Sequence, residues 1–191
     1  MPRFTRAELD SYRDAEVPDL VGPGLRLLFV GINPGLWTAA TQTHFAHPGN
    51  RFYPALLEAG IITERVSPSA GMTDDDRDRL RARGIGITNV VRRATARASE
   101  LSDEELRAGG VELEETVRRT APKVVAIAGI TAYRTAFGQR GAVPGRQPAG
   151  LAGAELWIVP NPSGLNAHET IDSLAAAYAE PARAAGLLPA G

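Results

Sequence analysis

Four short apolar runs, separated by longer polar stretches, limit the folds that this chain can adopt. Each run is four to six residues long, which is typical of a buried strand. Runs that are apolar almost throughout, without alternation, favour strands buried on both faces of a parallel sheet. The runs are Leu25–Val30, Gly86–Val91, Val124–Gly129 and Leu156–Val159.

Helical patterns lie between these runs. Phe52–Ala59 places apolar residues three and four positions apart, as one face of a helix requires. Ser102–Thr120 opens with a Ser-Asp-Glu-Glu capping box and stops before Pro122. Strands that alternate with helices predict a parallel sheet with helices on both faces. Two further helices are expected at Ile130–Phe137 and Ile171–Ala185.

The length of 191 residues suits one domain, so we expect residues 1–191 to form a single unit. Residues 1–24 predict a short leading helix and a linker, and the glycine-rich stretch Gly138–Gly153 predicts a surface loop. No apolar run approaches the roughly 20 residues that span a bilayer, and the first residues show no secretory pattern. We therefore expect a cytoplasmic protein without membrane contact.

Composition excludes several kinds of site. The chain has no cysteine, which rules out disulfides, thiolate zinc sites and cysteine-ligated clusters. Its three histidines show no metal-ligand spacing, so no metal site is expected. The net charge of −1 gives no general signal for nucleic acid. All basic residues but Lys123 are arginine, whose fork suits phosphates and base edges, although a GC-rich genome produces the same bias.

The segment Gly31–Gly35 directly follows the first predicted strand. Ligands of open parallel sheets bind at the carboxyl ends of the strands. The two glycines allow unusual backbone angles and close approach of a ligand, and Pro34 stiffens the turn. Asn33 thus presents a polar side chain from a rigid position, although asparagine before proline also caps turns. The segment is neither a dinucleotide fingerprint nor a phosphate loop.

Two apolar side chains lie within otherwise polar loops. Phe45 belongs to the loop His44–Tyr53, where it either packs beneath the loop or stacks on a flat ligand. Leu165 belongs to Pro160–Asn166, which follows the fourth predicted strand and so lies at the same expected sheet edge. It either staples the following helix or acts as an apolar wedge between bases. The residue pattern leaves both pairs of alternatives open.

These segments occur in the order found in a known family. The chain resembles the mismatch-specific uracil and thymine DNA glycosylases of the uracil-DNA glycosylase superfamily, over roughly residues 25–180. One such motif is weak on its own, whereas the ordered set is specific. The matching residues are Gly31–Leu36, Phe45–Pro48, Asn50–Phe52, Gly86–Val91, Arg93, Thr95, Glu100, Leu101, Gly109, Gly110 and Asn161–Leu165.

The resemblance implies a three-layer α/β/α fold around a short, mainly parallel central sheet. It implies a monofunctional glycosylase without a cofactor, and we expect a monomer. The implied partner is double-stranded DNA with a mispaired base, and the implied substrate is uracil opposite guanine. Damaged pyrimidines such as ethenocytosine are further expected substrates, with thymine opposite guanine as an extension. Such an enzyme flips its target nucleotide out of the base stack.

The family pattern places Asn33 beside the attacking water. A neutral amide is no general base and can only orient water through its carbonyl oxygen. The chemistry is therefore expected to be slow and to depend on positioning and on stabilisation of the leaving base. The pattern also implies contacts to the base by the backbone of Ile32, the stacking ring of Phe45 and the amide of Asn89. It implies a permissive substrate pocket at the small Gly35 and places Thr38 near the sugar or phosphate.

In the second segment, Gly164, Leu165 and Asn166 are expected to enter the duplex, with Leu165 in the space that the flipped base leaves. Asn161 and Ser163 are expected to contact the DNA as well, Ser163 at a phosphate.

Two positions depart from the family pattern. Ala167 stands where the family often has an arginine, so a phosphate contact is missing or comes from elsewhere. Trp37 is bulkier than the small residue common there, which puts pocket size and thymine excision in question. The candidate replacements for the phosphate contact are Arg92, Arg93, Arg140 and Arg146.

Two other functions fit parts of the pattern. A nucleotide-binding α/β enzyme without DNA chemistry would need a phosphate loop or a ribose-binding acid, and neither is seen. A mismatch-binding protein that has lost catalysis would tolerate a change at Asn33, which is intact.

Overall fold

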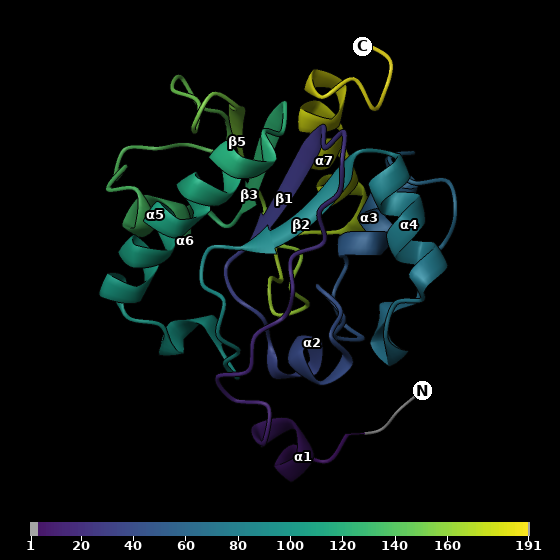
Figure 1. Cartoon of the computed structure of the whole chain (residues 1–191), viewed down its shortest axis with the longest axis vertical. Helices are drawn as coiled ribbons and strands as arrows, with labels where there is room; N and C mark the ends of the chain where they lie inside the picture. The colour runs from purple at the N-terminus through teal and green to yellow at the C-terminus, as the bar shows by residue number, and fades with distance from the viewer. Residues whose placement is uncertain (1–3, 191) are drawn as a thin grey trace.

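A five-stranded sheet forms the centre of the computed structural model, which describes residues 4–190 (Figure 1). The strand order is β2-β1-β3-β5-β4. Strands β2, β1, β3 and β5 run parallel, and β4 pairs antiparallel at the edge. The strands are β1 Leu27–Gly31, β2 Ile85–Asn89, β3 Val124–Ala128, β4 Gly145–Arg146 and β5 Glu155–Val159.

Apolar burial accounts for the parallel strands. Every residue of β1 and β3 is buried, because both faces of these central strands are covered. The four apolar runs therefore predict the parallel strands correctly, with bounds that differ by at most two residues. The short strand β4 lies inside the stretch predicted as a surface loop, and it covers the outer edge of β5 that would otherwise be unpaired.

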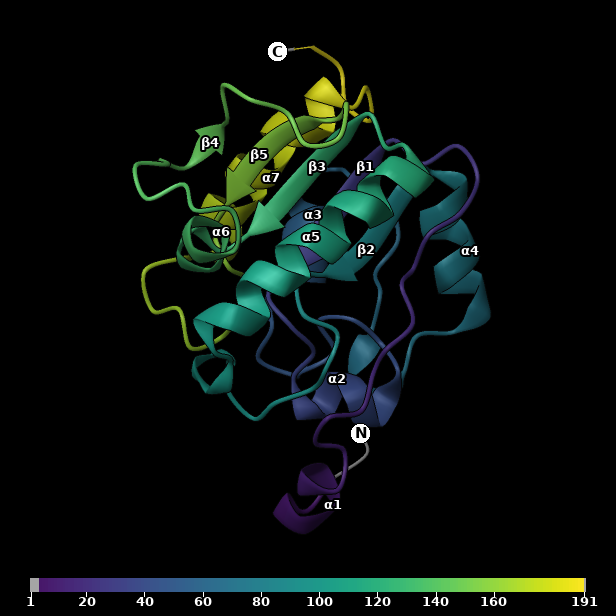
Figure 2. The same ribbon diagram turned by 60° about the vertical axis from the view of Figure 1, so that its left-hand side comes forward.

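Helices cover both faces of the sheet, which confirms the predicted three-layer α/β/α architecture (Figure 2). On β1, Phe29 packs against Phe52 and Tyr178, whereas its neighbour Val30 belongs to the core on the other face. This alternation follows from the two-residue period of a strand. Helices α3 Phe52–Glu58, α4 Asp74–Ala82 and α7 Ile171–Ala184 cover one face, and α5 Asp103–Thr120 and α6 Ile130–Ala136 cover the other.

Helix α5 lies unusually close to its neighbours. The Ser102 side chain accepts from the backbone N–H of Glu105, and the Glu105 side chain accepts from the backbone N–H of Ser102, which confirms the predicted capping box. A Cβ atom on Gly109 would clash with the backbone oxygen of Val90, just beyond β2. The glycine therefore permits close packing of α5 against the loop that follows β2.

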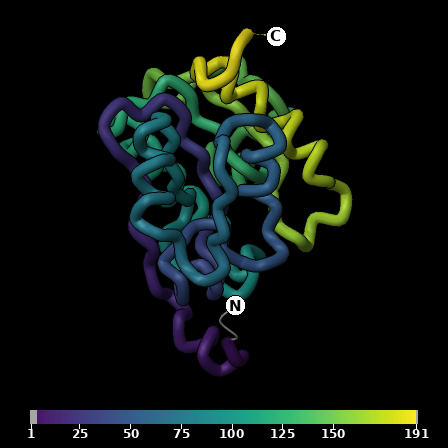
Figure 3. The backbone as a smooth tube through the Cα atoms, turned by 90° about the vertical axis from the view of Figure 1, so that its right-hand side faces the viewer, coloured from purple at the N-terminus to yellow at the C-terminus, as the bar shows by residue number. Residues whose placement is uncertain are grey.

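The N-terminal segment runs from α1, at the bottom of Figure 3, up one side of the molecule. Helix α1 Arg6–Asp10 packs against α2 Leu36–Thr41. Further along, the backbone of Leu20 exchanges hydrogen bonds of 2.9 and 2.8 Å with Ile87 of β2. Residues expected to form only a linker therefore close the outer edge of the sheet.

Some short elements have no counterpart among the sequence predictions. They are α2, α4, and two 3-10 turns at Pro68–Ala70 and Ala98–Glu100. Among residues 4–190, none of the helices combines the length and apolar character needed to cross a membrane.

Candidate active site

A cavity of about 840 Å³ opens at the carboxyl ends of the parallel strands. Gly31, Asn89 and Ala128, the last residues of β1, β2 and β3, all line it. Both predicted segments meet there, as the parallel topology requires. The cavity is lined by ten of the eleven residues singled out from the sequence: Ile32, Asn33, Gly35, Thr38, Phe45, Asn89, Asn161, Ser163, Gly164 and Leu165.

Glycine at the end of β1 is needed for space rather than for an unusual backbone angle. Gly31 and Gly35 both lack positive φ values, so the unusual backbone angles that glycine allows are not used at these two positions. A Cβ atom on Gly31 would lie 2.5 Å from Oδ1 of Asn89 and 3.3 Å from the Phe45 ring. Gly31 therefore leaves room for the Asn89 amide and the Phe45 ring to pack against the end of β1.

Asn33 is held by both hydrogens of its amide group. Its Nδ2 donates to the backbone oxygen of Arg93 at 3.0 Å and to Oγ1 of Thr95 at 2.8 Å. The Thr95 hydroxyl in turn donates to the backbone oxygen of Arg97 at 2.9 Å. The Arg93 oxygen can only accept, and the Thr95 hydroxyl hydrogen is already donated to Arg97. Both groups therefore require the N–H donors of the Asn33 amide, and this fixes the orientation of the side chain. The Oδ1 atom of Asn33 has no protein partner within residues 4–190 and is left as an acceptor at the cavity.

Phe45 combines the two alternatives that its sequence position left open. Its ring stacks on Phe52 with a centroid distance of 4.1 Å and an interplanar angle of 27°. The ring is only partly buried and also lines the cavity. The backbone of Phe45 has a φ of 56°, a left-handed conformation that is uncommon for a bulky residue. The ring is thus supported from below and offers a flat surface to a ligand.

Asn89 contacts a buried histidine that the sequence did not single out. Its Nδ2 lies 3.2 Å from Nδ1 of His44, and the opposite ring nitrogen of His44 lies 2.9 Å from the backbone oxygen of Pro18. Burial lowers the pKa of the His44 imidazole. The hydroxyl of Tyr53 donates to the backbone oxygen of His44 at 3.0 Å and fixes the loop at this point.

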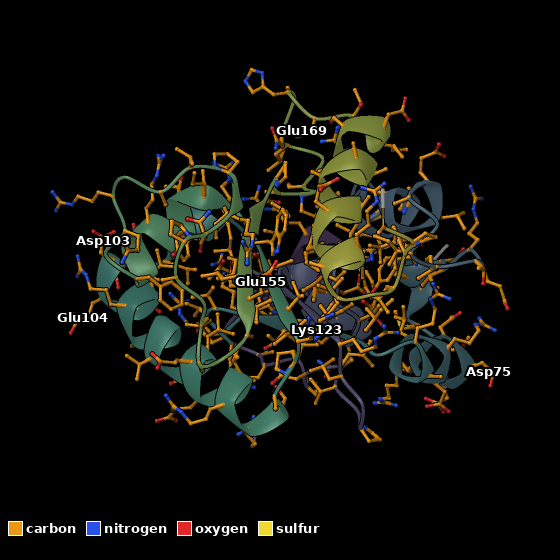
Figure 4. The ribbon with its side chains drawn as sticks, turned by 90° about the horizontal axis from the view of Figure 1, so that it is seen from above. Asp75, Asp103, Glu104, Lys123, Glu155 and Glu169 are labelled. Carbon is orange, nitrogen blue, oxygen red and sulfur yellow. The ribbon has the colours of Figure 1, made fainter. Side chains whose placement is uncertain are left out.

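The second segment is clamped to the first by Arg51. Its guanidinium donates to the backbone oxygens of Ser163 at 2.7 Å, of Asn166 at 2.6 Å, and of Glu169. Figure 4 shows Glu169 at the far end of this loop, beside the start of α7. The backbone of Arg51 also donates to the oxygen of Pro162 at 3.0 Å. The Arg51 side chain therefore binds three carbonyl groups spread along the loop. In the sequence, Arg51 was marked only as part of the family motif Asn50–Phe52.

Within this clamped loop the predicted residues differ in their surroundings. Leu165 is 89% exposed and lines the cavity mouth, which argues against the alternative of a hydrophobic staple for α7. Asn161 and Ser163 fold the loop locally, since Oδ1 of Asn161 accepts from the Ser163 backbone at 2.9 Å. Asn166 lies outside the cavity lining, and its amide donates to the backbone oxygen of Asn161 at 3.1 Å. A Cβ on Gly164 would lie 2.6 Å from the oxygen of Gly49, so the two loops touch.

Trp37, Gly35 and Thr38 form the wall of the cavity beside Asn33. The indole of Trp37 donates to the backbone oxygen of Ser69 at 3.0 Å, which holds this bulky ring in place. A Cβ on Gly35 would meet nothing within 4 Å, so this position leaves the cavity open. Thr38 is buried against the same wall.

Three of the four arginines expected to replace the family phosphate contact are engaged in ion pairs, and the fourth, Arg140, does not line the cavity. Arg97, which carried no sequence signal, is exposed, lines the cavity and has no ion pair within residues 4–190. The same described residues contain no group of three or more His, Asp or Glu side chains that could hold a metal ion. The ion pairs join Arg92 to Asp19, Arg93 to Glu105 and Arg146 to Glu155.

Comparisons with known proteins bear on the family and the fold of the chain. The sequence model of the uracil DNA glycosylase superfamily matches residues 18–180, which is most of the chain. The fold is similar to the solution NMR structure of a protein from Methanosarcina acetivorans that is provisionally described as a uracil DNA glycosylase. That likeness has a TM-score of 0.61 at 19% sequence identity, and it covers 91% of this chain and 98% of that chain. At this level of identity the likeness shows the fold.

Proposed function

The chain belongs to the uracil DNA glycosylase superfamily, and we propose that it removes uracil mispaired with guanine from double-stranded DNA. The reaction is hydrolysis of the N-glycosidic bond, without a cofactor. One observation carries the proposal: both amide hydrogens of Asn33 are bound to the protein, and its carbonyl oxygen is left at a cavity lined by Phe45 and Asn89.

Asn33 orients the attacking water. Its Oδ1 accepts a hydrogen from water and turns an oxygen lone pair toward the sugar carbon of the flipped nucleotide. The amide does not remove the proton, because it is not basic at neutral pH. The rate therefore depends on alignment and on stabilisation of the departing base, and we expect slow turnover.

Phe45 and Asn89 hold the flipped base. The base stacks on the cavity face of Phe45, whose other face rests on Phe52. The Asn89 amide offers an acceptor and a donor to the Watson–Crick edge of the base. Gly35 leaves space beside the pyrimidine ring of the bound base. This space supports ethenocytosine, and by extension thymine, as further substrates. Trp37 sets the limit on that space.

Leu165 holds the duplex open. Its exposure at the tip of a clamped loop suits a wedge that fills the gap left by the flipped base. Backbone groups of the same loop can bind the exposed edge of the widowed guanine. Unstacking is least costly at a mismatch, which favours a mispaired uracil over a paired one. Arg97, at the cavity and without an ion pair in the described part of the chain, supplies the phosphate contact that Ala167 lacks.

A direct assay distinguishes this function from its rivals. The protein is incubated with an end-labelled duplex that holds one G·U pair, and the products are treated with alkali. Strand cleavage at the uracil position is the expected result. Binding without cleavage would favour a mismatch-binding protein, and the absence of both would favour a nucleotide-binding enzyme. Parallel duplexes with A·U, G·T and ethenocytosine, and single-stranded uracil, then rank the substrates.

A further inference from the structure

Residues 4–16, called here the N-terminal arm, lie before the region that matches the family, which begins at residue 18. The arm nevertheless reaches the cavity. Leu9 of α1 lines it, and the ring of Phe4 packs edge-on against the indole of Trp37 with a centroid distance of 4.9 Å. Figure 2 shows α1 beyond α2, at the end of the sheet toward which the strand arrows point. The reaction proposed for the site uses none of these residues.

Asn33 depends on a loop that lies between its own segment and the arm. Both hydrogens of its amide are bound to this loop, by the backbone oxygen of Arg93 and the hydroxyl of Thr95. On the inner side, the backbone N–H of Thr95 donates to the oxygen of Pro34 at 3.1 Å. The loop therefore sets where the carbonyl oxygen of Asn33 lies in the cavity, and contacts that fix the outer side of the loop also fix Asn33.

The arm binds the outer side of the loop through two backbone hydrogen bonds. The oxygen of Ala94 accepts from the N–H of Asp14, and its N–H donates to the oxygen of Ala15, both at 2.9 Å. Ala94 is fully buried, so these backbone groups depend on the arm for their partners. Asp14 has a φ of 62°, a left-handed conformation that is uncommon outside glycine. The chain turns sharply there and presents its N–H to the loop.

A second connection between the arm and the loop runs through side chains. Arg13 pairs with Glu100 at 2.6 Å, and the other carboxylate oxygen of Glu100 accepts from the backbone N–H of Arg97 at 2.8 Å. The backbone oxygen of Arg97 accepts from the Thr95 hydroxyl at 2.9 Å, and that hydroxyl accepts from the Asn33 amide. A continuous series of polar contacts thus joins an exposed arginine of the arm to Asn33.

We propose that the N-terminal arm is a positioning element of the active site, which acts through Ala94 and Glu100 to hold the Asn33 amide in its productive orientation. The catalytic consequence rests on the proposed function, because only then does the position of Asn33 set a rate. A misplacement of about 1 Å at the reacting groups lowers a rate by up to about 100-fold, even when the change that causes it lies far from the chemistry.

Two substitutions at Asp14 separate the arm from the loop and join it again. Proline cannot adopt a φ of 62° and has no N–H for the oxygen of Ala94, so Asp14→Pro breaks the backbone connection. Glycine accepts this angle and keeps the N–H, so Asp14→Gly is the variant that restores the connection, although it lacks the ion pair with Arg93.

Ala152→Pro is the matched control for the backbone conflict. Ala152 also has a left-handed backbone, with a φ of 48°, and lies in the turn before β5, at the end of the sheet opposite the cavity. Arg13→Met is a milder variant of the arm that should fold readily, because Arg13 is exposed and only its side-chain contacts are lost. Urea unfolding of each variant establishes that it is folded under the assay conditions.

Single-turnover excision from a G·U duplex is measured with the protein in saturating excess, so that weaker binding does not enter the rate. We expect Asp14→Pro to slow excision by about 10- to 100-fold, and Asp14→Gly to recover most of the rate. Arg13→Met should slow excision by about 2- to 5-fold, as loss of a surface ion pair allows. Ala152→Pro should stay within about 2-fold of the wild type.

A double-mutant cycle with Asn33→Ala shows whether the arm acts through Asn33. In that background, Asp14→Pro should slow the remaining excision by less than about 2-fold, because the side chain that the arm positions is already absent. An equal fold-loss from Asp14→Pro with and without Asn33 would overturn the proposal.

The side-chain amide signals of Asn33 in ¹H–¹⁵N spectra provide a readout that does not depend on activity, and Asn33→Ala identifies them by their loss. Both hydrogens are bound to the loop, so both signals should shift in folded Asp14→Pro and stay in place in Ala152→Pro. Unchanged signals, or an unchanged excision rate, in folded Asp14→Pro would overturn only the role of the arm. If Asp14→Pro does not fold, Arg13→Met takes its place in both tests. A wild-type protein that excises no uracil would overturn the proposed function, and the Asn33 signals would still test the arm.

Discussion

Replacing Arg51 with methionine should release the loop that carries Leu165 while leaving the sheet and its two cores intact. The guanidinium donates to three backbone oxygens of the loop, those of Ser163, Asn166 and Glu169. Methionine keeps much of the apolar stem but makes none of these bonds. Lysine keeps the charge but offers one ammonium group in place of a planar fork, so Arg51→Lys should be intermediate.

The size of the effect follows from the number and kind of bonds. Hydrogen bonds to charged groups contribute about 1.5–3 kcal/mol each. The loop carbonyls return to water when the clamp is lost, so the combined loss belongs near the low end, at about 2–3 kcal/mol. If an ordered loop is needed for insertion into the duplex, this loss appears as a decrease of roughly 30- to 150-fold in kcat/KM for a G·U duplex.

The assay measures kcat/KM on a G·U duplex together with base flipping, followed by the fluorescence of 2-aminopurine next to the uracil. Arg118→Met is the matched control, because Arg118 lies on α5, away from the site, and within residues 4–190 its one ion pair is with Glu114 on the surface. Flipping and kcat/KM should fall together for Arg51→Met and stay unchanged for the control. Wild-type flipping and excision in a folded Arg51→Met protein would refute the clamp.

Three further predictions test other parts of the site. Arg97→Gln should weaken binding to all duplexes alike and reduce the slope of log K against log salt by about 0.9, as loss of one phosphate contact requires; an unchanged slope would remove Arg97 from the interface. Gly31→Ala should abolish most excision, because its Cβ would lie 2.5 Å from the carboxamide oxygen at the end of β2, whereas the exposed Gly141→Ala serves as a control. Because burial lowers the pKa of His44, its contribution to stability is present above pH ~6.5 and is lost as pH falls below that value, at up to about 1.4 kcal/mol per pH unit. Urea unfolding between about pH 7.5 and pH 5 should show this loss in the wild type and in His168→Gln, and much less of it in His44→Gln; equal slopes in all three proteins would contradict it.

The sheet could be predicted from the sequence because its signals are local. The four parallel strands are apolar runs, and α5 begins at a capping box that is visible in the sequence. Helix α4 was not predictable from periodicity, because Leu80 is its only buried apolar residue. It depends on a capping box between Thr73 and Asp76, and on the ion pair of Asp76 with Arg79.

The residues of the candidate site that lie at the ends of strands could be predicted from the sequence. The contacts that hold them could not, because they join residues far apart along the chain. Asn33 follows β1 and Asn89 is the last residue of the neighbouring parallel strand β2, so topology brings them to one edge. The support of Asn33 comes from Thr95, which lies 62 residues further along the chain. Arg51 reaches Ser163 across 112 residues. No local pattern indicates such a pairing, and the role of a glycine in making space is equally invisible until its neighbours are placed.

The proposed role of Asn33 is to position water for excision of a mispaired uracil. Single-turnover excision from a G·U duplex by the wild type and by Asn33→Ala, with duplex affinity measured in parallel, isolates that role. We expect the wild type to cleave the bond, and the variant to be at least about 100-fold slower with nearly unchanged affinity. Excision by Asn33→Ala at close to the wild-type rate would show that Asn33 does not position the water.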